Sequence, residues 1–310
     1  MEFDAASVRP GRAPARPDAT VRPDATVRPD ATVRPDATVR PDATVGPPGG
    51  DAEVRATWRA VAIPAEHGGW GLTLEPVVLG LLVEWSVAGL ALGLAAFTAF
   101  LLRTPAKLVA VDLRRGRWLE RSLVALQVAA IEAMVLATCV VVAVREAGWT
   151  WWVPVAVAAP LVAVELWFEV RSRGRRLVPE LCGAVGVAAV VAAVVVAGDG
   201  SGRLAAASWL VLAARAAGAI PYVRVQILRL RRGSGPVRHS DVAQAVSVVL
   251  GGVAVVVDGA ALLGFVGVTV LAVLQVMAVR RAPVPAKRLG IRQMAMGLGL
   301  VLLTAVGASW

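Results

Sequence analysis

Residues 61–310 are a succession of long apolar runs separated by short basic connections, and this pattern restricts the fold more than any other feature. The hydrocarbon core of a bilayer is about 30 Å thick and is crossed by about 20 apolar residues in a helix. Only 17% of the chain is charged and 57% is hydrophobic, a composition that excludes a soluble enzyme. The sequence therefore predicts an all-α, polytopic transmembrane helical bundle. Nine spans are expected, near 70–84, 86–102, 122–143, 151–169, 180–198, 204–222, 241–257, 259–279 and 293–309.

The first two expected spans share one apolar stretch that is interrupted at Glu84-Trp85-Ser86. A single helix through this stretch would be longer than any bilayer is thick. We therefore expect two helices joined by a tight turn at these three residues.

The basic residues of the connections fall on one side of the expected bundle. With nine spans, Arg145 and Arg203 lie on one side, and 20 Lys and Arg residues lie on the side of the N-terminus. Basic loops are retained in the cytoplasm, so this asymmetry predicts a plasma-membrane protein with a cytoplasmic N-terminus and Trp310 outside. The four basic loops are 103–121, 170–179, 223–240 and 280–292. Their charge matches an anionic lipid surface, so we expect membrane lipids and no nucleic acid as partners.

Residues 1–60 form a separate, low-complexity region before the membrane domain of residues 61–310. Residues 16–45 are five identical copies of Arg-Pro-Asp-Ala-Thr-Val. Each copy contains a proline, which removes a backbone donor and fixes φ, together with alternating charges. Such a segment buries too little apolar surface to offset its ordering entropy, so we predict that residues 1–55 are disordered. A repeat of six can also indicate a β-helix, but the apolar ladder of that fold is missing.

Three charged residues, Glu75, Glu132 and Arg215, lie inside the expected spans away from their ends, where charge is costly and marks a candidate functional site. Arg215 is the only basic residue deep in an expected span. By depth, Glu132 is its first expected partner and Glu75 its second. The arrangement predicts either a structural ion pair or a site for a ligand or proton. Three further acidic residues near span ends are expected to reach water: Glu84, Glu165 and Asp258.

The segment 63–76 joins the repeat region to the first span and has an unusual composition. It contains Glu66, His67, Trp70 and Glu75 with three glycines between them. His67 can titrate near neutral pH, and free backbone amides at a helix start favour an anion. The segment is either an anion site or an interfacial cap that orients the first helix.

The same segment carries a family resemblance. Pro64-Ala-Glu-His-Gly-Gly-Trp-Gly, followed by Glu75-Pro76 and Leu79-Gly80 in an apolar run, resembles the N-terminal signature of the YwiC-like membrane proteins. The segment from Arg215 to Arg224, Arg-Ala-Ala-Gly-Ala-Ile-Pro-Tyr-Val-Arg, is similar to a second, weaker family segment. The resemblance covers residues 61–310 and implies a multi-span bacterial membrane protein without a settled activity.

The expected topology is also similar to that of the UbiA-type prenyltransferases, which would imply Mg²⁺ bound by aspartate-rich motifs after spans two and six. The matching loops, 103–121 and 223–240, contain Asp112 and Glu120 in the first and Asp241 at the edge of the second. Two or more carboxylates per motif are needed to join Mg²⁺ to a diphosphate. We therefore expect no metal and no cofactor, and we assign no catalytic residue.

Two functions fit these features, and a scaffold is a third. The first is a cytoplasm-facing polar cavity, lined by His67, Arg103, Arg215 and Arg224, that binds a lipid or isoprenoid with an anionic head. The alternative is a proton-coupled secondary transporter of a small solute, although the spans show no inverted repeat. The candidate ligand-binding residues are Glu66, His67, Trp70, Glu75, Arg103, Glu132, Arg215 and Arg224.

A single spatial observation would support a site. Transport would use Glu75 and Glu132 as proton carriers, and a site requires that these two side chains, His67 and Arg215 converge on one cavity. The sequence predicts no particular oligomeric state.

Overall fold

The computed structural model describes Trp58 and residues 67–116, 120–171 and 176–309, with the backbone alone for residues 67–69. The repeat region and Glu66 lie outside these residues. Within the described ranges all regular secondary structure is helical. The helices are α2 (His67–Val83), α3 (Val87–Arg114), α4 (Glu120–Ala147), α5 (Trp152–Val170), α6 (Leu177–Ala188), α7 (Val190–Ala197), α8 (Gly202–Arg232), α9 (Val237–Val257), the short 3₁₀ helix η1 (Gly259–Ala261), α10 (Leu262–Arg280) and α11 (Ala286–Ala308).

These helices confirm the predicted membrane bundle. In the described part of the chain, eight segments are long and apolar enough to cross a bilayer, and α2 adds the shorter apolar stretch Trp70–Val83. Helices α6 and α7 count as one segment, Leu177–Ala197, because the helix is interrupted only at Ala189. The protein is therefore a multi-pass membrane protein with an all-helical fold.

The turn between α2 and α3 confirms the predicted break in the first apolar stretch. Helix α2 ends at Val83, and the backbone of Ser86 is extended. The hydroxyl of Ser86 accepts a hydrogen bond from the backbone nitrogen of Gly89 at 2.9 Å. A side-chain acceptor at this position satisfies a backbone donor that a helix start leaves free.

Several helices extend beyond the predicted spans at their basic ends. Helix α8 continues to Arg232 and stops at Gly233, whose φ of 73° is the left-handed conformation that glycine adopts easily. Its last turn carries three arginines, which interact favourably with the negative end of the helix dipole. Hydropathy detects only the apolar part of such a helix, so the prediction ended too early.

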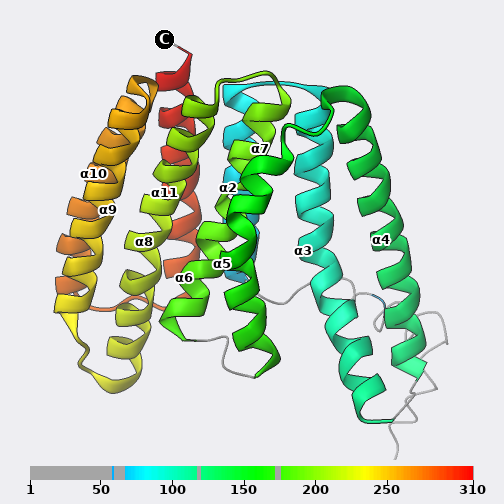
Figure 1. The fold of residues 1–310 in the computed structure, drawn as a ribbon. Helices are drawn as coiled ribbons and strands as arrows, with labels where there is room; N and C mark the ends of the chain where they lie inside the picture. The colour runs from blue at the N-terminus through cyan, green and yellow to red at the C-terminus, as the bar shows by residue number, and fades with distance from the viewer. Residues whose placement is uncertain (1–57, 59–66, 117–119, 172–175, 310) are drawn as a thin grey trace, which may run out of the picture. The chain divides into compact units, whose positions relative to one another are not determined.

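The connections alternate between the two ends of the bundle (Figure 1). The α3–α4, α5–α6, α8–α9 and α10–α11 connections lie at one end, and the remaining four lie at the other, where α11 also finishes. We call the first the basic end, because it carries Arg114, Arg171, Arg232 and Arg281. The basic loops are thus segregated as expected, and the assignment of this end to the cytoplasm stays a prediction.

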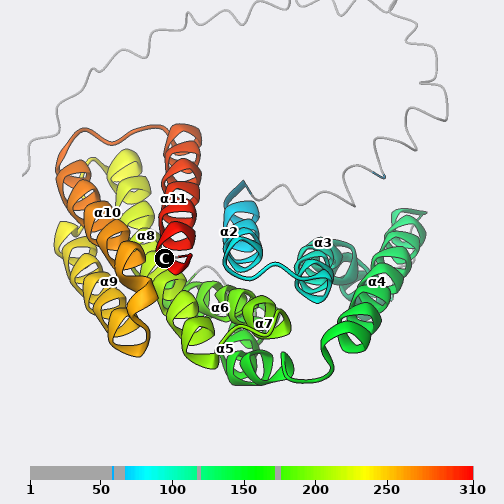
Figure 2. The ribbon, with the colours of Figure 1, turned by 90° about the horizontal axis from the view of Figure 1, so that it is seen from above.

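Helix α8 is the central helix of the described bundle. It packs against α2, α6, α7, α9, α10 and α11. Figure 2, a view along the bundle, shows α8 beside α9, α10 and α11. One apolar cluster joins α8 to α2, α7 and α11 around Leu79, Val195 and Val301. A second joins α8 to α9 and α10 around Val211 and Val268.

Candidate functional site

Arg215 lies near the middle of α8 and is only 8% exposed. Its Nη2 donates a hydrogen bond to the backbone carbonyl of Gln293 in α11 at 2.7 Å. The same nitrogen lies 3.8 Å from Oε1 of Glu75, which is at the middle of α2 and 6% exposed. Arg215 therefore links α8 to both α2 and α11.

The partner of Arg215 is Glu75, and the prediction of Glu132 as its first partner was wrong. Helix α2 packs against α8, whereas the main packing partner of α4, which carries Glu132, is α3. Depth in the membrane does not show which helices are neighbours, so it could not decide between the two glutamates. Oε2 of Glu132 is buried and has no hydrogen-bond partner among the described residues.

A glycine makes room for the Glu75 carboxylate. A Cβ atom built on Gly297 of α11 would collide with that carboxylate. Glu75 therefore lies directly against the α11 backbone, one helical turn from Gln293. Gly297 belongs to the Gly-x-Gly pattern of this helix, and the second glycine of the pattern, Gly299, faces open space.

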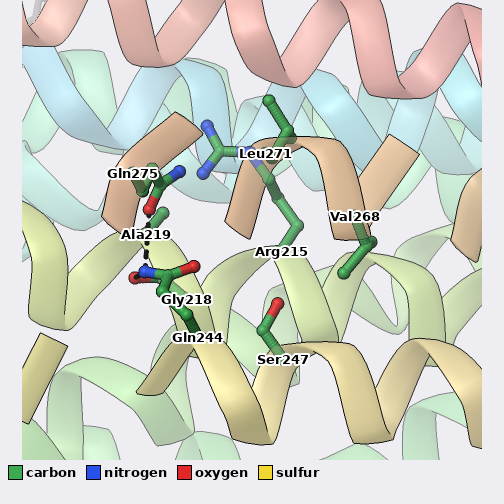
Figure 3. Close-up of a pocket in the computed structure, with 8 residues that line it drawn as sticks. All are labelled: Arg215, Gly218, Ala219, Gln244, Ser247, Val268, Leu271 and Gln275. Carbon is green, nitrogen blue, oxygen red and sulfur yellow. Dashed lines mark hydrogen bonds between the residues drawn. The ribbon is translucent and has the colours of Figure 1, made fainter. Parts of the chain in front are cut away.

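A small cavity with polar and apolar walls lies beside Arg215, between α8, α9 and α10 (Figure 3). It has room for about one water molecule. Nε of Arg215 is buried and has no hydrogen-bond partner among the described residues. The cavity is lined by Arg215, Gly218, Ala219, Gln244, Ser247, Val268, Leu271 and Gln275.

Neutral polar side chains hold the walls of this cavity together. The Nε2 group of Gln244 donates to the Gly218 carbonyl at 2.9 Å and to Oε1 of Gln275 at 3.0 Å. The hydroxyl of Ser247 donates to the Ala214 carbonyl at 2.7 Å. The sequence analysis missed all three residues, although polar residues within apolar spans are a signal that could have found them, because membrane helices use such groups to bond to one another.

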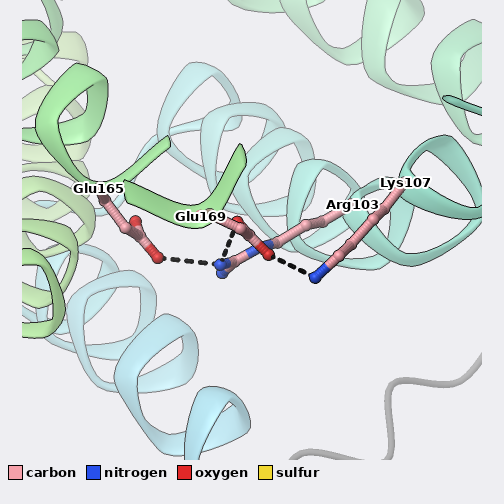
Figure 4. Close-up of polar contacts among 4 residues, drawn as sticks. All are labelled: Arg103, Lys107, Glu165 and Glu169. Carbon is pink, nitrogen blue, oxygen red and sulfur yellow. Dashed lines mark hydrogen bonds and ion pairs between the residues drawn. The ribbon is translucent and has the colours of Figure 1, made fainter. Parts of the chain in front are cut away.

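Arg103 belongs to a separate cluster of four charged side chains that joins α3 to α5 (Figure 4). Its Nη2 lies 2.6 Å from Oε2 of Glu169 and 3.0 Å from Oε1 of Glu165, and Nζ of Lys107 lies 3.0 Å from Oε1 of Glu169. Glu165 was expected to reach water, but it is paired with Arg103 and lies against Gly183 of α6. The two basic and two acidic charges of this cluster balance.

The other predicted residues have structural contacts. Nη1 of Arg224 lies 2.7 Å from Oε2 of Glu180 in α6, and both side chains are about two-fifths exposed. The Trp70 ring lies 5.5 Å from the rings of Phe97 and Phe100 in α3. The backbone of His67 begins α2, and its side chain lies outside the described residues, as does Glu66.

The predicted residues thus do not share one set of contacts. Glu75 and Arg215 meet beside a polar cavity, whereas Arg103 and Arg224 each bind glutamates of other helices. In the described ranges, no group of three or more His, Cys, Asp and Glu side chains is placed to hold a metal ion.

Comparison with known proteins identifies a family for part of the chain. A family model described as YwiC-like protein matches residues 63–196, which include α2 to α6 and nearly all of α7. No curated protein and no solved structure matches the chain, so the likeness to UbiA-type prenyltransferases stays a prediction. Glu75, Arg103 and Glu132 lie within the matched range, and Arg215 lies beyond it. The chain is thus similar to the YwiC-like family over residues 63–196, a range that includes the motif around His67.

Proposed function

We propose that the protein is a proton-coupled secondary transporter of a small solute, in which Glu75 and Arg215 form the coupling site. The observation that carries this proposal is the pair itself: a carboxylate and a guanidinium, both more than nine-tenths buried, at the middle of two apolar helices. An ionisable residue at this depth is costly and is a functional candidate by default.

The geometry of the pair suits a reversible contact. At 3.8 Å the closest atoms attract by charge but are too far apart for a hydrogen bond. The guanidinium directs its bond to the Gln293 carbonyl instead. A buried ion pair without hydrogen bonds between its members recovers its desolvation cost poorly. Protonation of Glu75 would therefore break no hydrogen bond to Arg215.

The pair also connects helices that could move relative to one another. Arg215 attracts Glu75 of α2 and donates to the backbone of α11. A proton on Glu75 removes its charge attraction to Arg215 and leaves the bond from Arg215 to α11 and the apolar contacts of α2 intact. Proton binding would thus weaken one of the contacts between α2 and α8, and coupled transport requires such a link between protonation and helix contacts.

The binding of an anionic-headed lipid or isoprenoid is the weaker proposal. Arg103 and Arg224, which were expected to line its cavity, are neutralised by Glu165, Glu169 and Glu180. A lipid phosphate would have to displace these carboxylates. The cavity beside Arg215 has room for about one water molecule, far less than an isoprenoid needs.

The proposal is tested by proton flux in proteoliposomes that contain a pH-sensitive dye. Small sugars, amino acids, carboxylates and inorganic anions are added outside in turn, with and without an imposed pH gradient. We expect at least one class to accelerate proton movement in the wild type and not in Glu75→Gln. Glu120→Gln, at the exposed start of α4, is the matched control and should behave as wild type. Equal proton flux in the wild type and Glu75→Gln across the whole panel would overturn the proposal.

A further inference from the structure

A row of polar side chains follows one face of α8 from Arg215 to the basic end. Its members are Arg215, Tyr222, Gln226 and Arg229, which we call the polar stripe. Their spacings of seven, four and three residues place them on the same side of a helix. Tyr222 and Gln226 are 4% and 2% exposed, so the stripe is buried within the protein rather than facing lipid. At 1.5 Å per residue it extends about 21 Å along the helix.

Helix α10 supplies partners for the lower part of the stripe. Nε2 of Gln226 donates to the hydroxyl of Tyr222 at 3.2 Å and to the Ala278 carbonyl at 3.1 Å. Arg229 donates to the carbonyls of Val279 and Arg281 near the end of α10. The stripe therefore lies along the contact between α8 and α10.

Helix α9 presents a matching polar face. Ser240, Gln244 and Ser247 are spaced by four and three residues, and each is at most 3% exposed. Gln244 and Ser247 bond to the α8 backbone around the cavity, and Ser240 lies one turn nearer the basic end. Polar groups of three helices thus continue from the cavity toward this end.

Three polar atoms along this row are buried and lack a hydrogen-bond partner among the described residues. They are Nε of Arg215, Oε1 of Gln226 and Oγ of Ser240. Buried polar groups in folded proteins are nearly always satisfied, by protein or by ordered water. Their occurrence in one row, with a cavity beside the first, indicates that something other than protein bonds to them.

The free groups suit water better than an ion. Both N–H bonds of the Gln244 amide and the hydroxyl proton of Ser247 are already donated. Arg215 Nε is a free donor, whereas Gln226 Oε1 is a free acceptor. These two atoms are eleven residues apart on α8, so separate molecules must satisfy them. Water both donates and accepts, and the cavity beside Arg215 has room for about one water.

We infer that ordered water molecules occupy the contact between α8, α9 and α10 and form a hydrated path from Arg215 to the basic end. Hydrogen-bonded water carries protons readily, so this path supplies the Glu75–Arg215 pair from one face of the membrane. The role as a proton path rests on the proposed function, whereas the hydration does not.

The test measures how fast cysteines placed along the path react with silver ions, which are small enough for a narrow aqueous path. The two natural cysteines, Cys139 and Cys182, are first replaced by alanine. Ser240→Cys and Gln244→Cys then report on the path. Val246→Cys and Val249→Cys are the matched controls, because these α9 side chains are 47% and 65% exposed on the outside of the bundle. Cysteines that escape Ag⁺ in membrane vesicles are alkylated after denaturation and counted by mass spectrometry.

Only the thiolate reacts, and a thiolate forms where water reaches the sulfur. We expect the path cysteines to react at least about tenfold faster than the two lipid-facing controls, because hydrocarbon keeps a thiol protonated. Cysteine is nearly isosteric with serine. The labelling rate of Ser240→Cys therefore remains interpretable if Gln244→Cys disturbs the packing. Rates for both path cysteines that equal those of the controls would show a dry polar contact and overturn the inference.

The labelling experiment uses no solute and no pH gradient, so its result is independent of the transport assay. Fast labelling together with unchanged proton flux in Glu75→Gln would keep the hydrated path and reject the transporter. Slow labelling together with lost flux in Glu75→Gln would reject the path and keep the transporter.

Discussion

Charged residues are handled in opposite ways in the two halves of the described bundle. In α8, where 72% of the most apolar stretch is buried, Arg215 is enclosed, donates a hydrogen bond to a backbone carbonyl and lies 3.8 Å from a single carboxylate. In α4 and α5 only 11% and 6% of the corresponding windows are buried. Toward the basic end, Arg103 and Lys107 of α3 bind Glu165 and Glu169 of α5 through short contacts.

The two regions differ in what it costs to place a charge there. Some charges in a membrane protein cost little, and others are so costly that they indicate a function. Charges near helix ends can pair and still reach water, so their cost is small. A charge at mid-membrane depth has no such relief. Glu75, Arg215 and Glu132 are of the second kind, and we place the function at the two that pair, Glu75 and Arg215. Mutations should show that the two kinds differ in the size of their effect.

The largest effect is expected from Arg215→Met. It leaves the Glu75 carboxylate buried without a counter-charge, which should lower the free energy of unfolding by about 3–5 kcal/mol. Denaturant titration in mixed micelles measures the loss. The double variant Glu75→Leu/Arg215→Met removes both charges and should recover most of it. If the double variant is no more stable than Arg215→Met, the loss does not come from an unpaired Glu75.

The second largest effect is expected at the contact between Gly297 and the Glu75 carboxylate. Gly297→Ala places a methyl group against the Glu75 carboxylate, and the resulting overpacking should cost about 1–3 kcal/mol. Gly299→Ala, two residues along the same helix, meets open space and is the matched control. It should be neutral or stabilising by up to about 1 kcal/mol, because alanine has the higher helix propensity. Equal effects of the two substitutions would mean that Gly297 is not fitted to Glu75.

A smaller loss is expected from Gln244→Leu, which removes the hydrogen bonds to Gly218 and Gln275. Hydrogen bonds between membrane helices contribute on average about 0.6 kcal/mol and at most about 1.7 kcal/mol. The same titration should therefore show a loss in this range. Val249→Leu on the exposed side of α9 should leave stability unchanged. A loss as large as that of Arg215→Met would show that the amide network, rather than the ion pair, organises the centre of the bundle.

The fold follows from the sequence because its two signals are local and independent. The lengths of the apolar runs locate the helices. The number of helices is checked by whether the basic connections fall on one side of the membrane. The break at Glu84-Trp85-Ser86 could be predicted since an unbroken helix would not fit a bilayer. The extension of α8 to Arg232 could not, because charged residues outside the hydrocarbon region continue a helix without an apolar signal.

The candidate site follows from the sequence only in part. Arg215 and Glu75 stand out as charges within apolar runs, but their pairing depends on which helices are neighbours, and hydropathy carries no such information. This is why Glu132 was preferred. Gln244 and Gln275 were not predicted as site residues, because a single uncharged amide does not interrupt an apolar span. The free atoms of the hydrated path are visible only when three helices are placed together.

The smallest loss of stability is expected at the cluster of Arg103, Lys107, Glu165 and Glu169 on α3 and α5. It provides the contrast to the buried Glu75–Arg215 pair. Arg103 has two carboxylate partners, so Glu169→Ala leaves it paired with Glu165. The side chains of Arg103 and Glu169 are 41% and 18% exposed, so water and salt screen their attraction. A double-mutant cycle with Arg103→Ala and Glu169→Ala should give a coupling energy below about 1 kcal/mol that falls further as salt is added. A large coupling that salt does not change would place this cluster in the same class as the Glu75–Arg215 pair. The distinction between tolerated and functional charge would then have to be drawn on grounds other than burial.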